Sequence, residues 1–294
     1  MKDPRAATLD PSLQGSRAAA SIRTFRAGPA ILCLFLSLSC TSKSVHTSAR
    51  TGILRDAGAQ AGLNYRWSHG DQSPLNIQQT LGHGCAFLDY DQDGLLDILL
   101  VGEHHAHLYH NLGSGRFQDV TAESGITAAG DLFGVAVGDY DNDGFPDVYL
   151  TGYGICALYH NEGRDRKSGS GPLFRDVTAK AGVGAAGPYD LASAAAFVDL
   201  DGDGLLDLFV GRYIVFTPDT PHLCTFNGVR AGCGVQSYEP APPRVYRNMG
   251  NGRFRDMTQK WGFGAVRGKI LGLAVRAADS GPGVELYAAC DELP

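Results

Sequence analysis

The sequence predicts an all-β fold: a β-propeller built from four-stranded blades. The first observation behind this prediction is internal repetition. The motif DYDQDGLLD at 89–97 recurs as DYDNDGFPD at 139–147 and as DLDGDGLLD at 199–207. The second observation is that each copy lies between short apolar runs, which an aromatic run and a closing F-x-D run follow. Four short β-rich runs per unit, at a period of about 50 residues, are typical of a propeller or a similar repeat array.

Each run is justified by its composition. The apolar runs on either side of the acidic motif are too short and too close to turn residues to be helices. The aromatic runs contain Asn-x-Gly, which predicts a hairpin to the closing run. Two longer spacers, at 164–172 and 213–243, are interpreted as insertions in the second and third units.

Partial units flank the complete ones. Residues 53–70 are interpreted as a closing strand without its blade, and residues 270–294 as the start of a fourth blade that stops. The sequence therefore predicts about four blade units within a propeller domain at 51–294, incomplete at its C-terminus and truncated relative to a longer protein. An unfinished unit leaves a strand edge exposed, so a second chain could complete the disc.

The N-terminal segment 1–40 is interpreted as an export signal, followed by a linker at 41–50. An apolar run at 30–40 follows a basic stretch that contains Arg17, Arg23 and Arg26, as in a secretory signal. Cys40 after the small Ser39 is similar to the acylated residue of a bacterial lipoprotein signal, although Ser37 replaces the usual Leu. The expected location is therefore periplasmic, at the cell surface as a lipoprotein, or secreted.

Charge and hydrophobicity argue against two kinds of partner, nucleic acid and a membrane spanned by a helix. The formal net charge of −6 disfavours a nucleic-acid backbone, which rewards a basic surface. No apolar run reaches the ~18 residues of a membrane-spanning helix, so membrane contact is expected only through a lipid anchor.

The acidic motif predicts a calcium site, because four carboxylates within nine residues repel one another unless a cation lies among them. In D-x-D-x-D-G-x-x-D, side chains at positions 1, 3, 5 and 9 and the carbonyl at position 7 can form an all-oxygen cage of the kind that Ca²⁺ prefers. Three such sites are expected. Their ligands would be Asp89, Asp91, Asp93, Leu95 and Asp97 in the first loop, Asp139, Asp141, Asp143, Phe145 and Asp147 in the second, and Asp199, Asp201, Asp203, Leu205 and Asp207 in the third.

Two alternatives to this interpretation fail. An EF-hand needs Glu at position 12 and flanking helices, whereas position 12 here is Leu100, Leu150 or Val210. Aspartates that only form turns would not keep one spacing in three copies. A fourth copy at Asp279 lacks the spacing, so no site is expected there.

The seven cysteines do not form a disulfide-dense scaffold. Cys224 and Cys233 lie in a glycine-containing segment and are expected to close a small loop through a disulfide in an exported protein. Cys85, Cys156 and Cys290 fall in apolar runs and are interpreted as small buried residues.

The acidic loops resemble the FG-GAP or VCBS repeats of integrin α-subunit propellers. The order FLDYDQDGLLD followed by LYHN-x-G-x-G-x-F-x-DVT is more closely similar to the cartilage acidic protein type of the ASPIC/UnbV group. This resemblance covers about residues 50–294. It implies a calcium-dependent, secreted or surface-anchored propeller, usually with seven blades, and it carries over only the twelve loop aspartates as ligands.

Two functions are considered. The first is a non-catalytic, adhesion-type module that binds an extracellular or periplasmic protein or glycan. The second is a carbohydrate-active enzyme, such as a polysaccharide lyase, which needs a base near the substrate. The only suggestive cluster is EHHAHLYH, where strand alternation would place His105 and His107 on one face, near Glu103 or His104. The interaction module is favoured, because no coherent catalytic set is found.

Overall fold

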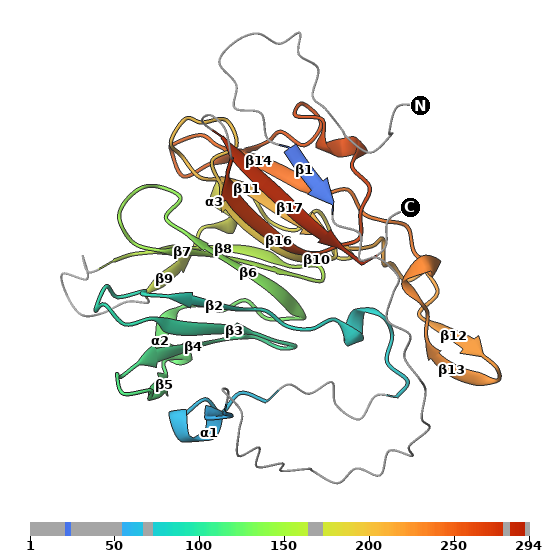
Figure 1. Ribbon diagram of the computed structural model, residues 1–294, viewed down its shortest axis with the longest axis horizontal. Helices are drawn as coiled ribbons and strands as arrows, with labels where there is room; N and C mark the ends of the chain where they lie inside the picture. The colour runs from blue at the N-terminus through green and yellow to red at the C-terminus, as the bar shows by residue number, and fades with distance from the viewer. Residues whose placement is uncertain (1–20, 25–54, 67–72, 164–172, 279–282, 292–294) are drawn as a thin grey trace.

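The computed structural model describes residues 21–24, 55–66, 73–163, 173–278 and 283–291 (Figure 1). Within them, three four-stranded antiparallel sheets follow one another along the chain, and each has its strands in sequence order. The first contains β2 (Cys85–Leu88), β3 (Asp97–Val101), β4 (Ala106–Asn111) and β5 (Phe117–Asp119). The second contains β6 (Leu132–Gly138), β7 (Asp147–Gly152), β8 (Cys156–Asn161) and β9 (Phe174–Asp176). The third contains β10 (Ala192–Val198), β11 (Asp207–Arg212), β14 (Arg244–Asn248) and β15 (Phe254–Asp256).

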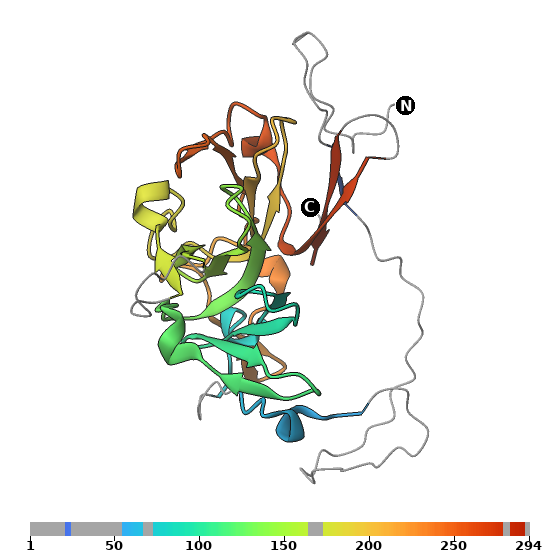
Figure 2. The ribbon, with the colours of Figure 1, turned by 90° about the vertical axis from the view of Figure 1, so that its left-hand side faces the viewer.

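These sheets are the predicted blades, and the all-β, four-stranded blade architecture is confirmed. The first strands of successive units lie next to one another in the order β2, β6, β10 and β16 (Ile270–Ala277). β16 pairs with β17 (Val284–Cys290), which gives the expected beginning of a fourth unit. Figure 2 shows this red hairpin beside the third blade. A short strand, β1 (Ser21–Thr24), pairs in parallel with β17.

Short helices were not anticipated. A single-turn helix follows the closing strand of the first two blades, α2 (Thr121–Ser124) and α3 (Thr178–Ala181). The predicted closing strand at 53–70 instead contains the corresponding turn, α1 (Gly58–Ala61), and no strand among its described residues 55–66. The part of the chain that the structure describes also contains 3-10 turns: η1 (Gln78–Thr80), η2 (Val235–Ser237) and η3 (Phe263–Ala265).

The hydrophobic core lies between neighbouring blades. One cluster packs Leu99 and Leu108 of the first blade against Leu150 of the second. A second packs Leu158 of the second blade against Leu208 of the third. The strand β7 is buried along its whole length, and its central residues Val148, Tyr149 and Leu150 are apolar, as expected of a strand covered on both faces.

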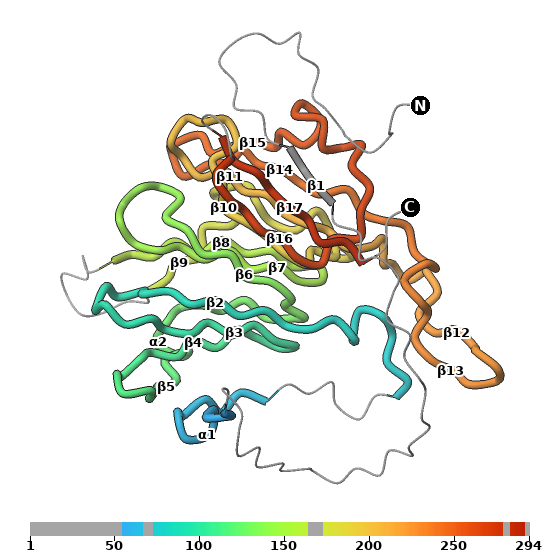
Figure 3. Tube along the Cα trace, viewed as in Figure 1, coloured from blue at the N-terminus to red at the C-terminus, as the bar shows by residue number. Residues whose placement is uncertain are grey.

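The insertion at 213–243 forms a hairpin that projects from the third blade, as the tube view shows (Figure 3). Its strands are β12 (Leu223–Phe226) and β13 (Val229–Gly232), joined by Asn227 and Gly228, both with positive φ. Asn-Gly is the preferred pair for such a two-residue turn, a signal that our interpretation of 213–243 as an insertion did not use. A disulfide joins Cys224 and Cys233, whose Cα atoms are 4.9 Å apart.

The free cysteines differ from expectation in part. Cys156 is buried as predicted, but Cys290 is only half-buried and Cys85 is exposed. Cys85 begins β2, where alternate side chains such as Phe87 also face solvent, with 62% of its surface exposed. The first strand of a blade is buried on both faces only where a strand of another blade packs on each face. The strand β2 packs against β6 on one face, and its other face is exposed.

Several predictions fall outside the described residues. They are the apolar core of the signal with Cys40, and the degenerate fourth motif at 279–282. In the part of the chain that the structure describes, no helix is long and apolar enough to cross a membrane.

Candidate metal centre

The three acidic loops lie at equivalent places in the three blades. Each joins the first strand of a blade to the second: β2 to β3, β6 to β7 and β10 to β11. All three pairs are antiparallel and in register up to the ninth residue of the motif, so the three loops emerge at the same end of the blades. Because strands flank each loop, the EF-hand alternative is excluded for these residues.

The first three aspartates of each motif converge. In each loop, one carboxylate oxygen from positions 1, 3 and 5 lies within 4.8 Å of the other two. The loop backbone causes this convergence. The carboxylate of Asp89 accepts hydrogen bonds from the amides of Asp93 and Gly94, both at 3.0 Å, and the second and third loops repeat both bonds. Gly94 has φ +87°, and a Cβ there would meet nothing within 4 Å, so the glycine is required for its backbone conformation.

The ninth-position aspartates occupy a different environment. Asp97, Asp147 and Asp207 begin the second strands and are fully buried. Each holds the loop closed by accepting two backbone amides. For Asp147 these are the amides of Tyr140 at 3.1 Å and Asn161 at 2.9 Å. Asp97 and Asp147 each also lie within 4.8 Å of their position-3 aspartate, whereas Asp207 is not part of such a group among the described residues.

The position-7 residues are Leu95, Phe145 and Leu205. Their amides donate to the position-5 carboxylates at 2.8, 2.8 and 3.0 Å. Each of these bonds bends the loop so that the position-5 side chain turns back toward positions 1 and 3. The carbonyl contribution of these residues to a metal shell remains a prediction.

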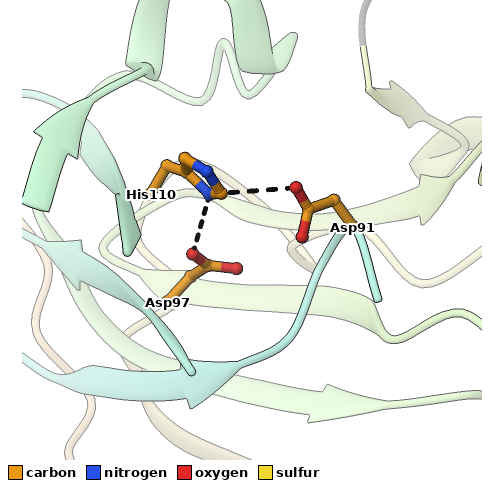
Figure 4. A group of neighbouring side chains, drawn as sticks. All are labelled: Asp91, Asp97 and His110. Carbon is orange, nitrogen blue, oxygen red and sulfur yellow. Dashed lines mark hydrogen bonds and ion pairs between the residues drawn. The ribbon is translucent and has the colours of Figure 1, made fainter. Parts of the chain in front are cut away.

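A basic side chain from the third strand faces each loop, and sequence reasoning missed this. Figure 4 shows His110 of β4 between two loop carboxylates. Its Nδ1 lies 3.1 Å from Asp97 and 3.8 Å from Asp91. His160 of β8 repeats the arrangement, with Nδ1 at 3.2 Å from Asp147 and 3.3 Å from Asp141. In the third blade the equivalent residue is Arg247. The signal was visible, because all three residues immediately precede the recurrent Asn of the aromatic run.

That recurrent Asn ties the blades together at the loops. The side chain of Asn161 donates to the Tyr90 carbonyl of the preceding blade at 2.9 Å, and Asn248 donates to the Tyr140 carbonyl at 2.7 Å. Successive loops also touch directly, since Gln92 donates to the Gly144 carbonyl at 2.6 Å. The loops therefore form a connected row rather than three separate sites.

The crowding of carboxylates shifts their pKa values. Burial raises the pKa of Asp97, Asp141, Asp147 and Asp201, and for all of these except Asp147 neighbouring loop carboxylates add to the rise. The pKa of Asp207 rises from 3.8 to about 7, mainly because of burial and partly because of Asp201 and Asp203. The pKa of His160 is raised by its hydrogen bond to Asp147. Both kinds of shift favour protonated loops when no metal is bound.

These shifts predict how stability depends on pH in the absence of calcium. A carboxyl whose pKa is higher in the folded state binds its proton more tightly there, so it stabilises the fold at low pH. For Asp207 this contribution is lost as pH rises from 3.8 to about 7, and the raised pKa of His160 acts in the same direction. We expect the Tm in EGTA to fall over this range.

Thermal melts in EGTA between pH 5 and pH 8 provide the measurement. Asp207→Asn should flatten the pH profile, because the amide does not titrate, whereas Asp219→Asn in the exposed part of the insertion should leave it unchanged. A Tm in EGTA that rises with pH over this range would contradict the assigned shifts.

The histidine cluster of the first blade does not form a comparable centre. The rings of His105 and His107 lie on one face, as predicted, with centroids 4.4 Å apart. The Nδ1 atom of His107 is 3.5 Å from the carboxylate of Asp119. However, no three ligand atoms of this cluster converge in the way that those of the acidic loops do within the described residues. His110 belongs to the first loop rather than to this cluster.

A cavity of about 660 Å³ lies at the opposite end of the blades. Residues at the starts of first strands line it, among them Gly84 before β2, Phe133 on β6 and Ser193 on β10. Tyr213, which donates a hydrogen bond to Asp291, also contributes to its wall. The cavity therefore does not include the acidic loops.

Comparison with known families agrees with this geometry. Residues 89–150 match the family model of the FG-GAP-like repeat. The matched range contains the first two acidic loops and the aromatic and closing strands between them. The third loop at 199–207 lies outside the match but has the same backbone hydrogen bonds. The match is consistent with the four-stranded sheets and the acidic loops of the matched range. No curated protein matches the chain.

Proposed function

We propose that this protein is an exported, calcium-binding β-propeller that acts as a non-catalytic interaction module for a protein or glycan outside the cytoplasm. The observation that carries the calcium part is the convergence of three carboxylates in each of three equivalent loops. The FG-GAP-like match at 89–150 supports the interaction role. The assignment to the cartilage acidic protein type, the export signal and lipidation at Cys40 belong to this proposal.

The donor set fits a hard divalent cation. In each loop the converging groups are carboxylates, and the third loop also keeps one oxygen of Asp201 buried without a hydrogen-bond partner among the described residues. Bound calcium would neutralise the repelling carboxylates, so its binding would be coupled to folding. This chain's own residues would preorganise the site, because the backbone amides already hold the carboxylates of positions 1 and 5 in place.

The test combines calorimetry and thermal melts of the full chain. We expect about three calcium ions per chain and a Tm in ~2 mM CaCl₂ well above that in EGTA. One site at a free calcium of ~100 times Kd stabilises the fold by roughly 2.7 kcal/mol. Asp91→Ala should remove one ion and part of this gain. Asp219→Ala, an equal charge change at an exposed position away from the loops, should remove neither. A calcium-independent Tm together with no heat of binding would refute the proposal.

A further inference from the structure

The residue that faces the acidic loop from the third strand is not the same in the three blades. It is His110 in the first, His160 in the second and Arg247 in the third, each immediately before the recurrent Asn. The two imidazoles lie closest to the buried ninth-position carboxylates, at 3.1 and 3.2 Å. An imidazole ring has at most two N–H donors for these carboxylates, whereas a guanidinium has five.

Arg247 lies closer to positions 3 and 5 of its loop than His160 does, whose ring nitrogens are 3.3 Å from Asp141 and 3.9 Å from Asp143. The Nε of Arg247 lies 2.6 Å from the carboxylate of Asp201, and its Nη2 lies 3.0 Å from that of Asp203. These are positions 3 and 5 of the motif, and both belong to the group that converges in this loop. The guanidinium therefore contacts the same carboxylates that calcium would need.

The charge of Arg247 is permanent. A guanidinium stays protonated at any physiological pH, and its planar fork suits two carboxylates at once. Its side chain is about 38% exposed, so it can leave the loop without breaking the core. The third loop thus carries a guanidinium cation of its own chain, whereas an imidazole ring faces each of the first two loops.

We propose that Arg247 is a built-in counterion of the third loop that competes with calcium for Asp201 and Asp203. This inference rests on the calcium-binding function proposed above and makes its three sites unequal. The third loop is held in shape without metal and binds calcium more weakly than the other two. Exposed ion pairs are individually weak. Because Arg247 makes two of them, we expect the third site to bind calcium about tenfold more weakly than the other two.

The experiment exchanges the basic residues between blades and measures calcium binding by calorimetry on the full chain. The wild type should show two tighter sites and one weaker site, and Asp201→Ala should abolish the weaker one. Arg247→Gln and Arg247→His should each tighten that site about tenfold. The reciprocal change, His160→Arg, should produce a second weak site.

Arg255→Gln is the matched control, because Arg255 is exposed and lies directly across the sheet from Arg247. It removes the same charge close to the loop without removing the contact. The proposal would be overturned if Arg247→Gln left the calcium affinity of the third site unchanged or lowered it. It would also be overturned if Arg255→Gln changed that affinity as much as Arg247→Gln does.

Thermal melts in EGTA separate this inference from the calcium proposal. A counterion stabilises the loop when no metal is present, so Arg247→Gln should lower the Tm in EGTA while Arg255→Gln should not. If the wild type binds no calcium, the calcium function fails, and the EGTA melts alone decide the counterion role. An unchanged Tm for Arg247→Gln in EGTA would then refute it.

Discussion

Replacement of Asp190 by Ala is expected to lower the free energy of unfolding by about 3–5 kcal/mol, because it leaves buried charges unpaired. Asp190 is only 3% exposed and lies just before β10. Its carboxylate accepts the Nε–H of Arg212 at 2.5 Å and pairs with the guanidinium of Arg244, which is also buried. It further accepts the amide of Ala186 at 2.9 Å. Burial already lowers the pKa of Arg212, so the loss of its counter-charge adds to an existing cost.

Urea unfolding with calcium present measures this effect apart from metal loss, since Asp190 lies just before β10 and the third acidic loop follows the other end of that strand. Asp190→Asn keeps an acceptor but not the charge and should lie between Ala and the wild type. Combining Asp190→Ala with Arg212→Leu should recover part of the loss, because one unpaired cation is removed. Exposed ion pairs contribute less than about 1 kcal/mol. A loss in this range for Asp190→Ala would show that the group of Asp190, Arg212 and Arg244 is not desolvated.

The second large effect is expected for Asp147→Ala. Asp147 is fully buried and accepts the amides of Tyr140 and Asn161. Its removal leaves two buried amides without partners, at about 1–3 kcal/mol each, so roughly 2–6 kcal/mol should be lost even in EGTA. The imidazole of His160, whose Nδ1 is 3.2 Å from the same carboxylate, loses this contact as well and keeps those with loop aspartates such as Asp141.

Asp141→Ala is the matched comparison. It removes an aspartate from the same loop, but Asp141 is exposed to solvent whereas Asp147 is buried. In EGTA it should leave stability unchanged or raise it, since the loop carboxylates repel one another. If the second loop binds calcium as proposed, both variants should also lose the stabilisation that this ion would provide. Equal destabilisation of the two variants in EGTA would contradict the distinct structural role of the ninth position.

The sequence by itself determined the blades and the loops, because both are local patterns. Strand alternation and the turn glycines act over a few residues, and the acidic motif places its carboxylates through hydrogen bonds within nine residues, such as Asp89 to Gly94. Repetition then fixed the blade boundaries without any knowledge of contacts between blades. The Asn227-Gly228 hairpin was equally local, and its signal was present but overlooked.

Only the tertiary structure decided which groups meet across large separations in the chain. The buried pairing of Asp190 with Arg212 and Arg244, and the bond from Asn248 to the Tyr140 carbonyl, join residues that no local period relates. The tertiary structure also separated Asp147 from the exposed loop aspartates, although the motif treats them alike. The physical reason is that burial and electrostatic neighbourhood depend on how the blades pack, and that packing also brings Arg247 onto Asp201 and Asp203.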